Sequence, residues 1–372
     1  MKRYVILSPA NPLRGGIASS SERLAQEIRE QGHEVDIVSF KKQYPDVLFP
    51  GKTQLTTDPA PKDIRIHSWI HAYNPFNWRK VAQSIAALKP DVLIVRYWIP
   101  FMGPSLGAIC KGVKQRTNAR VVCLADNLIP HEETPIDTAL TKRFLKHIDA
   151  MVVMSKSVGN DLRTFSQTIP YTYVAHPIYD NYGQKSDRLS ALKRLGLDES
   201  KRYILFFGFI RAYKGLDLLI DAFEKLQDTQ VELIVAGEFY SDEQEYKSDV
   251  VKRGLKERIH FFSEYIPNDQ VADFFAAADI VAQPYRSATQ SGISQLAYHF
   301  EKPMLVTNVG GLPEIVDHNE SGYVVEVDAN TVATALQDFF ENARLEEMTA
   351  ATIKAKSRFS WAALFDALDQ VD

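Results

Sequence analysis

Short apolar runs alternate along the chain with longer stretches whose apolar residues recur at helical spacing. In the first half, the apolar runs fall within residues 4–10, 34–40, 91–98, 119–127 and 149–155, and the first amphipathic stretch spans 20–32. Continuous apolar runs of this length between helices are typical of strands buried on both faces of a parallel sheet. We therefore predict a doubly wound α/β domain over residues 1–178.

The same alternation returns in the second half of the chain after a polar interval. Residues 171–202 are mostly polar and turn-forming, and the pattern restarts with an almost unbroken apolar run at 203–210. Later apolar runs fall within 231–237, 258–264, 279–285, 303–309 and 322–327. We predict a second α/β domain of the same kind over residues 179–355.

The tail, residues 356–372, is predicted to form a terminal amphipathic helix. Its apolar residues recur at helical spacing, so they would share one face that packs on a domain. The residues of this face would be Phe359, Trp361, Leu364, Phe365 and Leu368.

Length and composition agree with a two-domain globular protein. A chain of 372 residues exceeds one ordinary core, and 45% hydrophobic with 24% charged residues carries no sign of disorder. The formal net charge of −4 argues against a nucleic acid as the main partner. Only two cysteines occur, Cys110 and Cys123, which fits a reducing compartment. The first apolar run is too short for a signal peptide and no run approaches a membrane span, so we expect a cytoplasmic protein.

Ligands of doubly wound sheets bind outside the carboxyl ends of the strands, so the strand-to-helix loops are the places to search. In the first such loop, Gly15 and Gly16 would let the backbone approach a ligand. A tight turn with Ser19 or Ser20 as the helix cap explains the same residues. The dinucleotide motif G-x-G-x-x-G and the P-loop motif are both absent from the chain.

The loop after the run at 203–210 carries the strongest chemical signal. Gly208 ends the predicted strand, and Arg211 and Lys214 follow three residues apart before a helix. Two cations beside a helix N-terminus form a site for a diphosphate, since arginine chelates oxygens in a fork and lysine adds a compact charge. Two solvated surface cations are the alternative.

Polar residues also follow other predicted strands. Asp126, Asn127 and, after a turn, His131 follow the run at 119–127, where a histidine could contact a substrate hydroxyl or serve only as a surface or capping residue. Gly310 and Gly311 follow another strand, before a short helix that carries Glu314. No D-x-D triad occurs, and the histidines have no metal-ligand spacing, so we expect a site without a metal ion.

Several of these segments together resemble a known family. Residues 207–223 (FGFIRAYKGLDLLIDAF) and 284–326, which include "NVGGLPEIV", resemble the C-terminal domain of group 1 (family 4) glycosyltransferases. Residues 8–40 look like the start of the N-terminal domain of that family. The resemblance covers nearly the whole chain, and the motifs are specific as a set.

The resemblance implies a GT-B fold, in which two Rossmann-like domains face each other across a cleft and a final helix crosses back to the first domain. It implies a retaining transfer that needs no metal ion or other cofactor, with a UDP- or GDP-type nucleotide sugar on the C-terminal domain and the acceptor on the N-terminal domain. By position, Arg211 and Lys214 would stabilise the leaving diphosphate. His131 would face the sugar, Gly15 and Gly16 would line the junction of donor and acceptor, and Asp126 and Asn127 would lie on the acceptor side. The segment Glu264, Tyr265 and Ile266 would meet the base.

The chain departs from the family at two places. Phe209 stands where the family commonly has arginine, so Arg211 would replace that cation. Ala288 and Leu296 stand where many members carry a pair of glutamates that hold the sugar and the ribose. Thr289, Gln290, Ser291 and Ser294 are then the available neutral substitutes. The N–H groups of Gly292, Ile293 and Ser294 could bind phosphate, unless Thr289 and Ser291 only cap that helix.

Three hypotheses follow. The first is a retaining hexosyltransferase that acts on a saccharide or lipid-linked acceptor in bacterial cell-surface polysaccharide, lipopolysaccharide or glycolipid assembly. The second is a catalytically weak GT-B protein that binds a sugar nucleotide or serves as a partner subunit, which the missing glutamates favour. A GT-B epimerase or phosphorylase is the third, without a matching signature.

A peripheral contact with the inner face of the cell membrane would suit a lipid-linked acceptor. Trp98, Ile99, Phe101 and Met102 precede the basic residues Lys111, Lys114 and Arg116. An apolar tip followed by cations can rest on anionic lipid. Ordinary core and surface positions explain the same residues.

Overall fold

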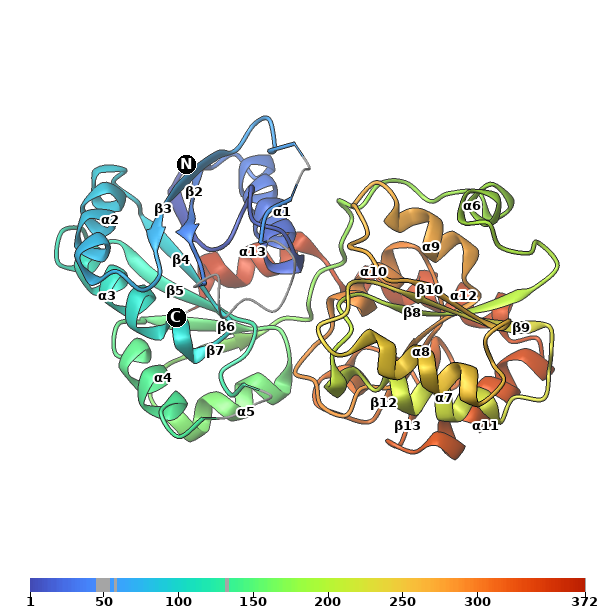
Figure 1. Ribbon diagram of the computed structural model, residues 1–372. Coiled ribbons are helices and arrows are strands. Elements are labelled where there is room, and N and C mark those ends of the chain that lie inside the picture. The colour runs from blue at the N-terminus through green and yellow to red at the C-terminus, as the bar shows by residue number, and fades with distance from the viewer. Residues whose placement is uncertain (45–53, 57–58, 131–133, 372) are drawn as a thin grey trace. The chain divides into compact units, whose positions relative to one another are not determined.

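A computed structural model describes residues 1–44, 54–56, 59–130 and 134–371. The chain divides into two compact units (Figure 1). Unit 1 comprises Met1–Pro177 together with Ser360–Asp372, and unit 2 comprises Ile178–Phe359. Each unit is built on one parallel sheet, as the alternation of apolar runs and helical stretches predicts.

Unit 1 contains a seven-stranded parallel sheet in the order β3-β2-β1-β4-β5-β6-β7. Its inner strand β1 is apolar on both faces, and Ile6 lies between Ile37 of β2 and Ile94 of β4. The strands are β1 (Arg3–Leu7), β2 (Glu34–Lys42), β3 (Arg65–His71), β4 (Val92–Tyr97), β5 (Arg120–Ala125), β6 (Ala150–Val153) and β7 (Tyr171–Tyr173).

Helices cover both faces of this sheet (Figure 1). Val5 and Leu7 share a core with residues of α2, α3, α4 and α5. Tyr4 points to the other face, where its ring meets Phe365 of α13. The helices are α1 (Gly16–Glu30), α2 (Pro75–Ala87), η2 (Pro100–Met102), α3 (Gly103–Lys114), α4 (Asp137–Leu145), α5 (Lys156–Phe165) and α13 (Trp361–Gln370).

Unit 2 contains a six-stranded parallel sheet in the order β10-β9-β8-β11-β12-β13. Phe206 of β8 joins a core with α7, α8, α11 and α12, and Phe207 turns to the opposite face to meet Phe274 and Phe275 of α9. The strands are β8 (Arg202–Phe207), β9 (Val231–Ala236), β10 (Ile259–Phe262), β11 (Ile280–Gln283), β12 (Met304–Thr307) and β13 (Gly322–Val325). The helices are α6 (Arg188–Leu195), η3 (Ala212–Lys214), α7 (Leu216–Glu224), α8 (Glu243–Lys252), α9 (Val271–Ala277), α10 (Gly292–His299), η4 (Leu312–Glu314), α11 (Ala329–Glu341), α12 (Leu345–Ala355) and η5 (Lys356–Arg358).

Short polar side chains fix where several helices begin. Ser155, Asp187, Asp328 and Ser360 accept hydrogen bonds from backbone amides in the first turns of α5, α6, α11 and α13. Such caps satisfy amides that have no partner inside a helix. These helix starts are therefore encoded locally, by the residue that precedes each helix.

The terminal helix and the first helix differ from the predictions in detail. Phe359 lies outside α13 and packs its ring against Tyr298 of unit 2 (4.4 Å between centroids). The helix itself belongs to unit 1, where Trp361 and Leu364 are buried. The alternative interpretation, in which Ser19 or Ser20 caps α1, is wrong, because α1 begins at Gly16 and both serines lie within it.

Both sheets follow the doubly wound order in which the second and third strands lie to one side of the first and the later strands to the other. The strand order therefore reverses between β1 and β4 in unit 1 and between β8 and β11 in unit 2. Ligands of such sheets bind at these switch points, outside the carboxyl ends of the strands.

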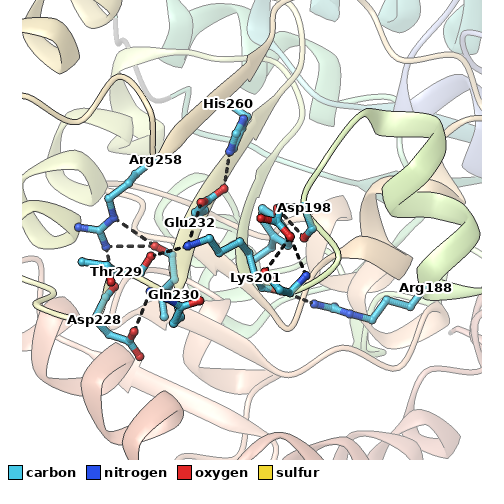
Figure 2. A network of polar contacts seen from close by, with 12 residues as sticks. Arg188, Asp198, Lys201, Asp228, Thr229, Gln230, Glu232, Arg258 and His260 are labelled. Carbon is cyan, nitrogen blue, oxygen red and sulfur yellow. Dashed lines mark hydrogen bonds and ion pairs between the residues drawn. The ribbon is translucent and has the colours of Figure 1, made fainter.

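The amino ends of β8, β9 and β10 carry a different kind of polar network (Figure 2). Glu232 accepts from His260 (2.6 Å) and lies 3.8 Å from the Lys201 amino group. Arg258 donates to the carbonyl oxygens of Asp228 and Val231. These contacts satisfy charges and strand-end carbonyls among themselves, which indicates a stabilising role at the end of the sheet opposite to the switch-point loops.

No helix within the described residues is long and apolar enough to cross a membrane. Of the four apolar residues proposed as a membrane tip, Met102 is fully buried, Trp98 and Ile99 are half-buried against the core, and Phe101 is exposed.

Candidate active site

Two loops of unit 2, after β8 and after β11, are held together at the switch point. Gly215 has a φ of 69°, and a Cβ built there would lie 2.1 Å from the Pro284 carbonyl oxygen. Only glycine allows so close an approach. The Arg286 amide also donates to the Tyr213 carbonyl oxygen (2.7 Å). The two loops therefore form one surface at the carboxyl ends of β8 and β11.

Lys214, at the end of η3, is a buried amine on this surface. The residue is 8% exposed, and its Nζ lies 5.6 Å from the centroid of the Tyr285 ring. Among the described residues, no carboxylate pairs with Lys214 and its amino group makes no hydrogen bond. Burial, and secondarily the positive charge of Arg211, lower the pKa of Lys214 from 10.5 to about 7. An anion bound here would stabilise the charged form of this side chain.

Arg211 supplies the second cation of the surface. It is exposed, and its guanidinium lies over the Tyr240 ring, 4.8 Å from the centroid. Within the described part of the chain no carboxylate pairs with Arg211. The predicted pair of cations therefore exists, with one member buried and the other exposed.

The loop before α10 meets the cations. Ile293 lies against Gly208, since a Cβ on Gly208 would come 3.0 Å from Ile293 Cδ1 and 3.2 Å from Lys214 Nζ. Ser291 caps α10, with its Oγ accepting from the Ile293 amide (3.3 Å). The Ser294 amide donates to the Ser291 carbonyl oxygen (3.2 Å). Two of the three amides predicted to bind phosphate thus have partners inside the loop, and Ser291 acts as a cap.

The loop after β12 supports the same surface. Gly310 has a φ of 51°, and a Cβ there would lie 1.4 Å from the Ala288 carbonyl oxygen. The Gly311 amide donates to the Thr289 carbonyl oxygen (3.1 Å). The strand before it ends at Thr307, so the glycines lie in the following turn rather than at the strand end. The two glycines allow the backbone of this turn to contact the loop that precedes α10.

Glu314 lies at the end of η4, half-buried. Its carbonyl oxygen accepts from Arg358 (3.0 Å). The predicted short helix therefore exists. Arg358 contacts Glu314 through its backbone, and the role of the Glu314 carboxylate stays a prediction.

Aromatic rings connect the β10 loop to the cations. Tyr265 stacks on Phe209 (6.5 Å between centroids, 28° between planes), and Phe209 stacks on Tyr240 (4.8 Å, 30°). Glu264 beside Tyr265 is exposed, and Ile266 is half-buried. The segment 264–266 thus reaches the site through the ring of Tyr265.

In unit 1, the glycine pair lies at the start of α1. Gly15 is the residue before the helix, with a φ of 112° that favours glycine, and a Cβ there would meet no atom within 4 Å. Backbone bonds to residues 54–55 hold the preceding residues in place. Leu13 forms a β-bridge with Leu55, and the Arg14 amide donates to the Gln54 carbonyl oxygen (3.0 Å). Gly15 therefore leaves open space beside a loop that is held in place.

Asp126 is engaged in a buried ion pair at the switch point of unit 1. The Arg96 guanidinium donates to both carboxylate oxygens of Asp126, at 2.7 Å each. Arg96 also donates to the hydroxyls of Ser20 (2.5 Å) and Ser21 (3.1 Å) in α1. This pairing ties β4, β5 and α1 together and occupies both oxygens of the carboxylate.

His176 and Asn127 lie near this pair and differ in their hydrogen bonding. His176 is buried, and its Nδ1 donates to the Pro177 carbonyl oxygen (2.8 Å). Burial, and then the charge of Arg96, lower the pKa of His176 to about 4. Asn127 Oδ1 is buried without a hydrogen-bond partner among the described residues, so it is the better placed of the two predicted acceptor-side residues to accept from a ligand. His131 lies outside the described residues.

Sequence models of two families match the chain, one on each unit. The model for glycosyl transferases group 1 matches residues 187–358, and the model for glycosyltransferase family 4 matches residues 14–178. The chain belongs to the group 1 / family 4 glycosyltransferases. Together the two matches span both switch-point surfaces described above.

Relatives of this glycosyltransferase include two curated bacterial enzymes. The lipopolysaccharide core biosynthesis mannosyltransferase LpsB of Rhizobium meliloti is 30% identical over 51% of this chain and 55% of its own length, so that match spans about half of either protein. The N-acetyl-alpha-D-glucosaminyl L-malate synthase of Bacillus anthracis is 22% identical over 86% of this chain and 83% of its own length.

Solved structures show that the glycosyltransferase has the GT-B fold. Sucrose-phosphate synthase from Thermosynechococcus elongatus has a TM-score of 0.78 at 18% identity and matches 100% of this chain and 98% of its own. Anabaena HepE in complex with UDP has a TM-score of 0.75 at 15% identity, over 100% and 99% of the two chains. The fold class and the family predicted from the sequence are confirmed.

The two positions at which many relatives carry glutamates are buried and apolar in this glycosyltransferase. Ala288 is 7% and Leu296 is 3% exposed, so neither presents a group to a ligand. Within the described residues, no three His, Cys, Asp or Glu side chains are grouped so that they could hold a metal ion.

Sequence reasoning missed several residues that shape the site of the glycosyltransferase. Tyr285 lies beside Lys214, Tyr240 lies under Arg211, and Arg96 holds Asp126. Each lies at or shortly after the carboxyl end of a strand, so proximity to a strand end was the available signal. Aromatic residues and an arginine within an apolar run are ordinarily assigned to packing.

Proposed function

We propose that this glycosyltransferase moves a hexosyl group, with retention of anomeric configuration, from a nucleotide-diphospho-sugar of the UDP or GDP type to a saccharide or lipid-linked acceptor. The observation that carries the proposal is Lys214, a buried amine without a carboxylate partner in the described chain, beside Arg211 at the switch point. A buried cation is costly unless a ligand neutralises it, and a diphosphate does so.

The same two cations would perform the electrostatic part of the reaction. As the glycosidic bond to the diphosphate breaks, negative charge develops on the leaving oxygen. Lys214 and Arg211 are fixed at the loop surface where that charge would appear, so they stabilise it more than they stabilise the donor. Because these cations supply the positive charge, we propose that the transfer needs no metal ion.

The remaining donor contacts would come from the loops packed around the cations. The backbone of Gly208, next to Lys214 Nζ, would lie beside the diphosphate, and the amide of Gly292 at the start of α10 would donate to it. Thr289, Gln290 and Ser294 would hold the sugar or ribose where relatives use carboxylates, with Ser291 fixing the loop. The segment 264–266 would meet the base, and Glu314 would contact the donor from η4.

The acceptor side is proposed for unit 1. Gly15 and Gly16 would admit the donor sugar, and Asn127 would accept a hydrogen bond from the acceptor through its buried oxygen. Asp126 would act by holding Arg96 and shaping the site. His131, outside the described residues, remains a predicted contact of the transferred sugar.

The related proteins support the class of substrates. One is named for lipopolysaccharide core biosynthesis, and a protein of the same fold was solved with UDP bound. We propose by analogy that this enzyme builds a bacterial cell-surface saccharide, working in the cytoplasm.

A peripheral membrane contact is proposed on narrower grounds. Phe101 is exposed, and Lys111 and Lys114 are exposed on the helix that follows. Flotation with anionic liposomes should carry the wild type upward and leave Phe101→Ser at the bottom. If wild-type protein stays with the soluble fraction, the contact does not occur.

Ligand-dependent melting tests the donor site. We expect one of UDP, GDP and ADP, in the presence of EDTA, to raise the unfolding free energy by about 2.7 kcal/mol at a concentration of 100 Kd. Lys214→Met should abolish this gain, whereas the matched control Lys302→Met should keep it. Lys302 is also a lysine of unit 2 whose pKa burial lowers, to about 8, but it donates to the Ala278 carbonyl oxygen. Stabilisation by none of the nucleotides would exclude the donor site.

A catalytically weak nucleotide-sugar binder or partner subunit is the second candidate. The buried apolar residues Ala288 and Leu296, where relatives carry glutamates, favour it. Donor turnover with a glycolipid extract separates the two, and NMR of the product anomer reports retention. Nucleotide binding without turnover would select the second candidate, and a product of inverted configuration would exclude the retaining mechanism.

A further inference from the structure

Four side chains of unit 2 form a continuous stack from the β8 loop to the β10 loop. The Arg211 guanidinium lies over Tyr240 (4.8 Å), Tyr240 stacks on Phe209 (4.8 Å, 30°), and Phe209 stacks on Tyr265 (6.5 Å, 28°). We call these four residues the aromatic column. All three rings are half-buried and the arginine is exposed. The column therefore ends in a cation at the site surface.

The backbone beneath the column is fixed by bonds between two loops. The Ile210 amide donates to the Glu238 carbonyl oxygen, and the Tyr240 amide donates to the Ile210 carbonyl oxygen, both at 2.9 Å. Gly237 allows this approach, since a Cβ there would lie 2.2 Å from the Gly208 carbonyl oxygen. The sheet pairing of β8 and β9 thus continues past the strand ends. Tyr240 is carried on this extension rather than on a separate loop.

Stacking on a ring suits an arginine that must bind phosphate. An exposed arginine has many rotamers, and binding a ligand with it costs the entropy of selecting one. A guanidinium that lies on a ring face is restricted, yet all its N–H groups point outward in its own plane and remain available to oxygens. The cation is then pre-organised before the ligand arrives.

We propose that Tyr240 is a positioning residue that holds Arg211 for the terminal phosphate of the nucleoside diphosphate, with Phe209 and Tyr265 supporting its ring. The inference rests on the proposed donor site. It explains how the chain keeps a second cation although Phe209 occupies the position directly after Gly208: the ring there supports Tyr240, and the cation comes from two residues further along. Tyr240 acts through Arg211 and not on the sugar.

The test compares a nucleoside diphosphate with its monophosphate by calorimetry. The probe is whichever of UDP, GDP and ADP binds the wild type, together with its monophosphate, and the readout is the ratio of the two Kd values. Tyr240→Leu should lower the preference for the diphosphate roughly three- to tenfold, the range for one arginine–ring contact. Tyr240→Phe keeps the ring and should behave as wild type. Phe261→Leu is the matched control, because Phe261 also lies beside a cation, Lys247, elsewhere in unit 2.

A double variant separates positioning from an independent contact. If Tyr240 acts through Arg211, Tyr240→Leu with Arg211→Met should discriminate no worse than Arg211→Met alone. Additive losses, an unchanged ratio in Tyr240→Leu, or a loss in Tyr240→Phe as large as in Tyr240→Leu would each overturn the proposal. Failure of the wild type to bind any of the nucleotides would instead refute the donor site itself, so the two failures are distinguishable.

Discussion

Burial of the Lys214 amine lowers the stability of the ligand-free protein. A role in binding an anion would explain why a lysine is nevertheless present. Its amine is buried, and its pKa of about 7 means that the charged form is much less favoured than in water. A purely structural position would be filled better by an apolar side chain of similar shape. The residue is therefore best understood through the anion that it binds.

The affinity for a nucleoside diphosphate should fall as the pH rises above 7. The free site loses the Lys214 proton near pH 7, whereas the bound diphosphate favours the charged amine, so binding takes up a proton in this range. The fall can reach about tenfold per pH unit. Calorimetry at pH 8 in two buffers of different ionisation heat measures the proton uptake. An affinity that stays constant from pH 7 to 9 would contradict this role.

The stability of the ligand-free protein should change with pH in the opposite direction. The unfolded chain holds this proton up to its ordinary pKa of 10.5 and the folded chain only to about 7, so Lys214 contributes stability that increases between these values. Lys214→Met removes both pH effects. At pH 6.5 this variant should melt at or above the wild-type temperature, because it removes a buried charge.

Asp126 should prove to be a structural partner of Arg96. Asp126→Asn leaves the Arg96 guanidinium buried without its carboxylate, which should cost about 3–5 kcal/mol of unfolding free energy in urea titrations. The double variant Arg96→Met with Asp126→Leu should recover most of this loss. A cost below about 1 kcal/mol for the single variant would show that the pair does not hold the loops.

At the scale of elements, the site of unit 2 depends on loops that touch through glycines. The turn after β12 presses on the loop before α10 at Gly310, and the loops after β8 and β11 meet at Gly215. Each contact joins backbone to backbone, so side chains cannot adjust around an added methyl group. The position of α10 relative to the cations follows from these approaches.

Gly310→Ala should therefore destabilise unit 2 more than the same substitution at a glycine that has a positive φ but open space around it. Gly254 has a φ of 71° but open space around its Cβ position, whereas a Cβ on Gly310 would overlap the Ala288 carbonyl oxygen. Gly254→Ala should cost about 1–2 kcal/mol from its φ alone. Gly310→Ala should cost clearly more and should weaken nucleotide binding as well. Equal losses in the two variants, measured by thermal melting and calorimetry, would remove the close approach as the cause.

At the scale of the molecule, the chain leaves unit 1 at Pro177 and returns to it at Ser360. The returning helix α13 fills a face of the first sheet, where Leu364 and Leu368 are buried and Tyr4 and Lys2 bond to Asp369. Unit 1 is thus incomplete until the last residues of the chain are present. In the sequence, unit 2 is inserted between the two segments that form unit 1.

Tryptophan fluorescence should separate the stability of the two units. All four tryptophans (Trp69, Trp78, Trp98 and Trp361) lie in unit 1. Leu364→Ala should lower the midpoint of the fluorescence transition and reduce the unfolding free energy of unit 1 by about 2–5 kcal/mol.

The matched control for this prediction is Leu336→Ala, in the buried face of α11 in unit 2. It should lower the circular dichroism transition and leave the fluorescence midpoint in place. A fluorescence midpoint that moves equally in both variants would show that the two units unfold as one.

The elements, the fold class and the family follow from the pattern of residues along the chain. Continuous apolar runs separated by helical spacing identify buried parallel strands because burial on both faces leaves no polar positions. Capping residues such as Ser155 and Asp187 fix helix starts through local bonds. The glycines that follow strands and the pair Arg211 and Lys214 could also be located from the sequence. The reason is that the carboxyl ends of parallel strands lie along one edge of a sheet, where ligands bind.

The contacts that those residues make are specified only in the folded chain. It placed Tyr240 under Arg211, Arg96 on Asp126, and Phe359 against Tyr298 rather than on the terminal helix. It also showed that Lys214 is buried while Arg211, three residues away, is exposed. These contacts join residues that are distant in the chain or turned by tight loops. A local pattern specifies which face of an element is apolar, but not which side chain from another element meets it.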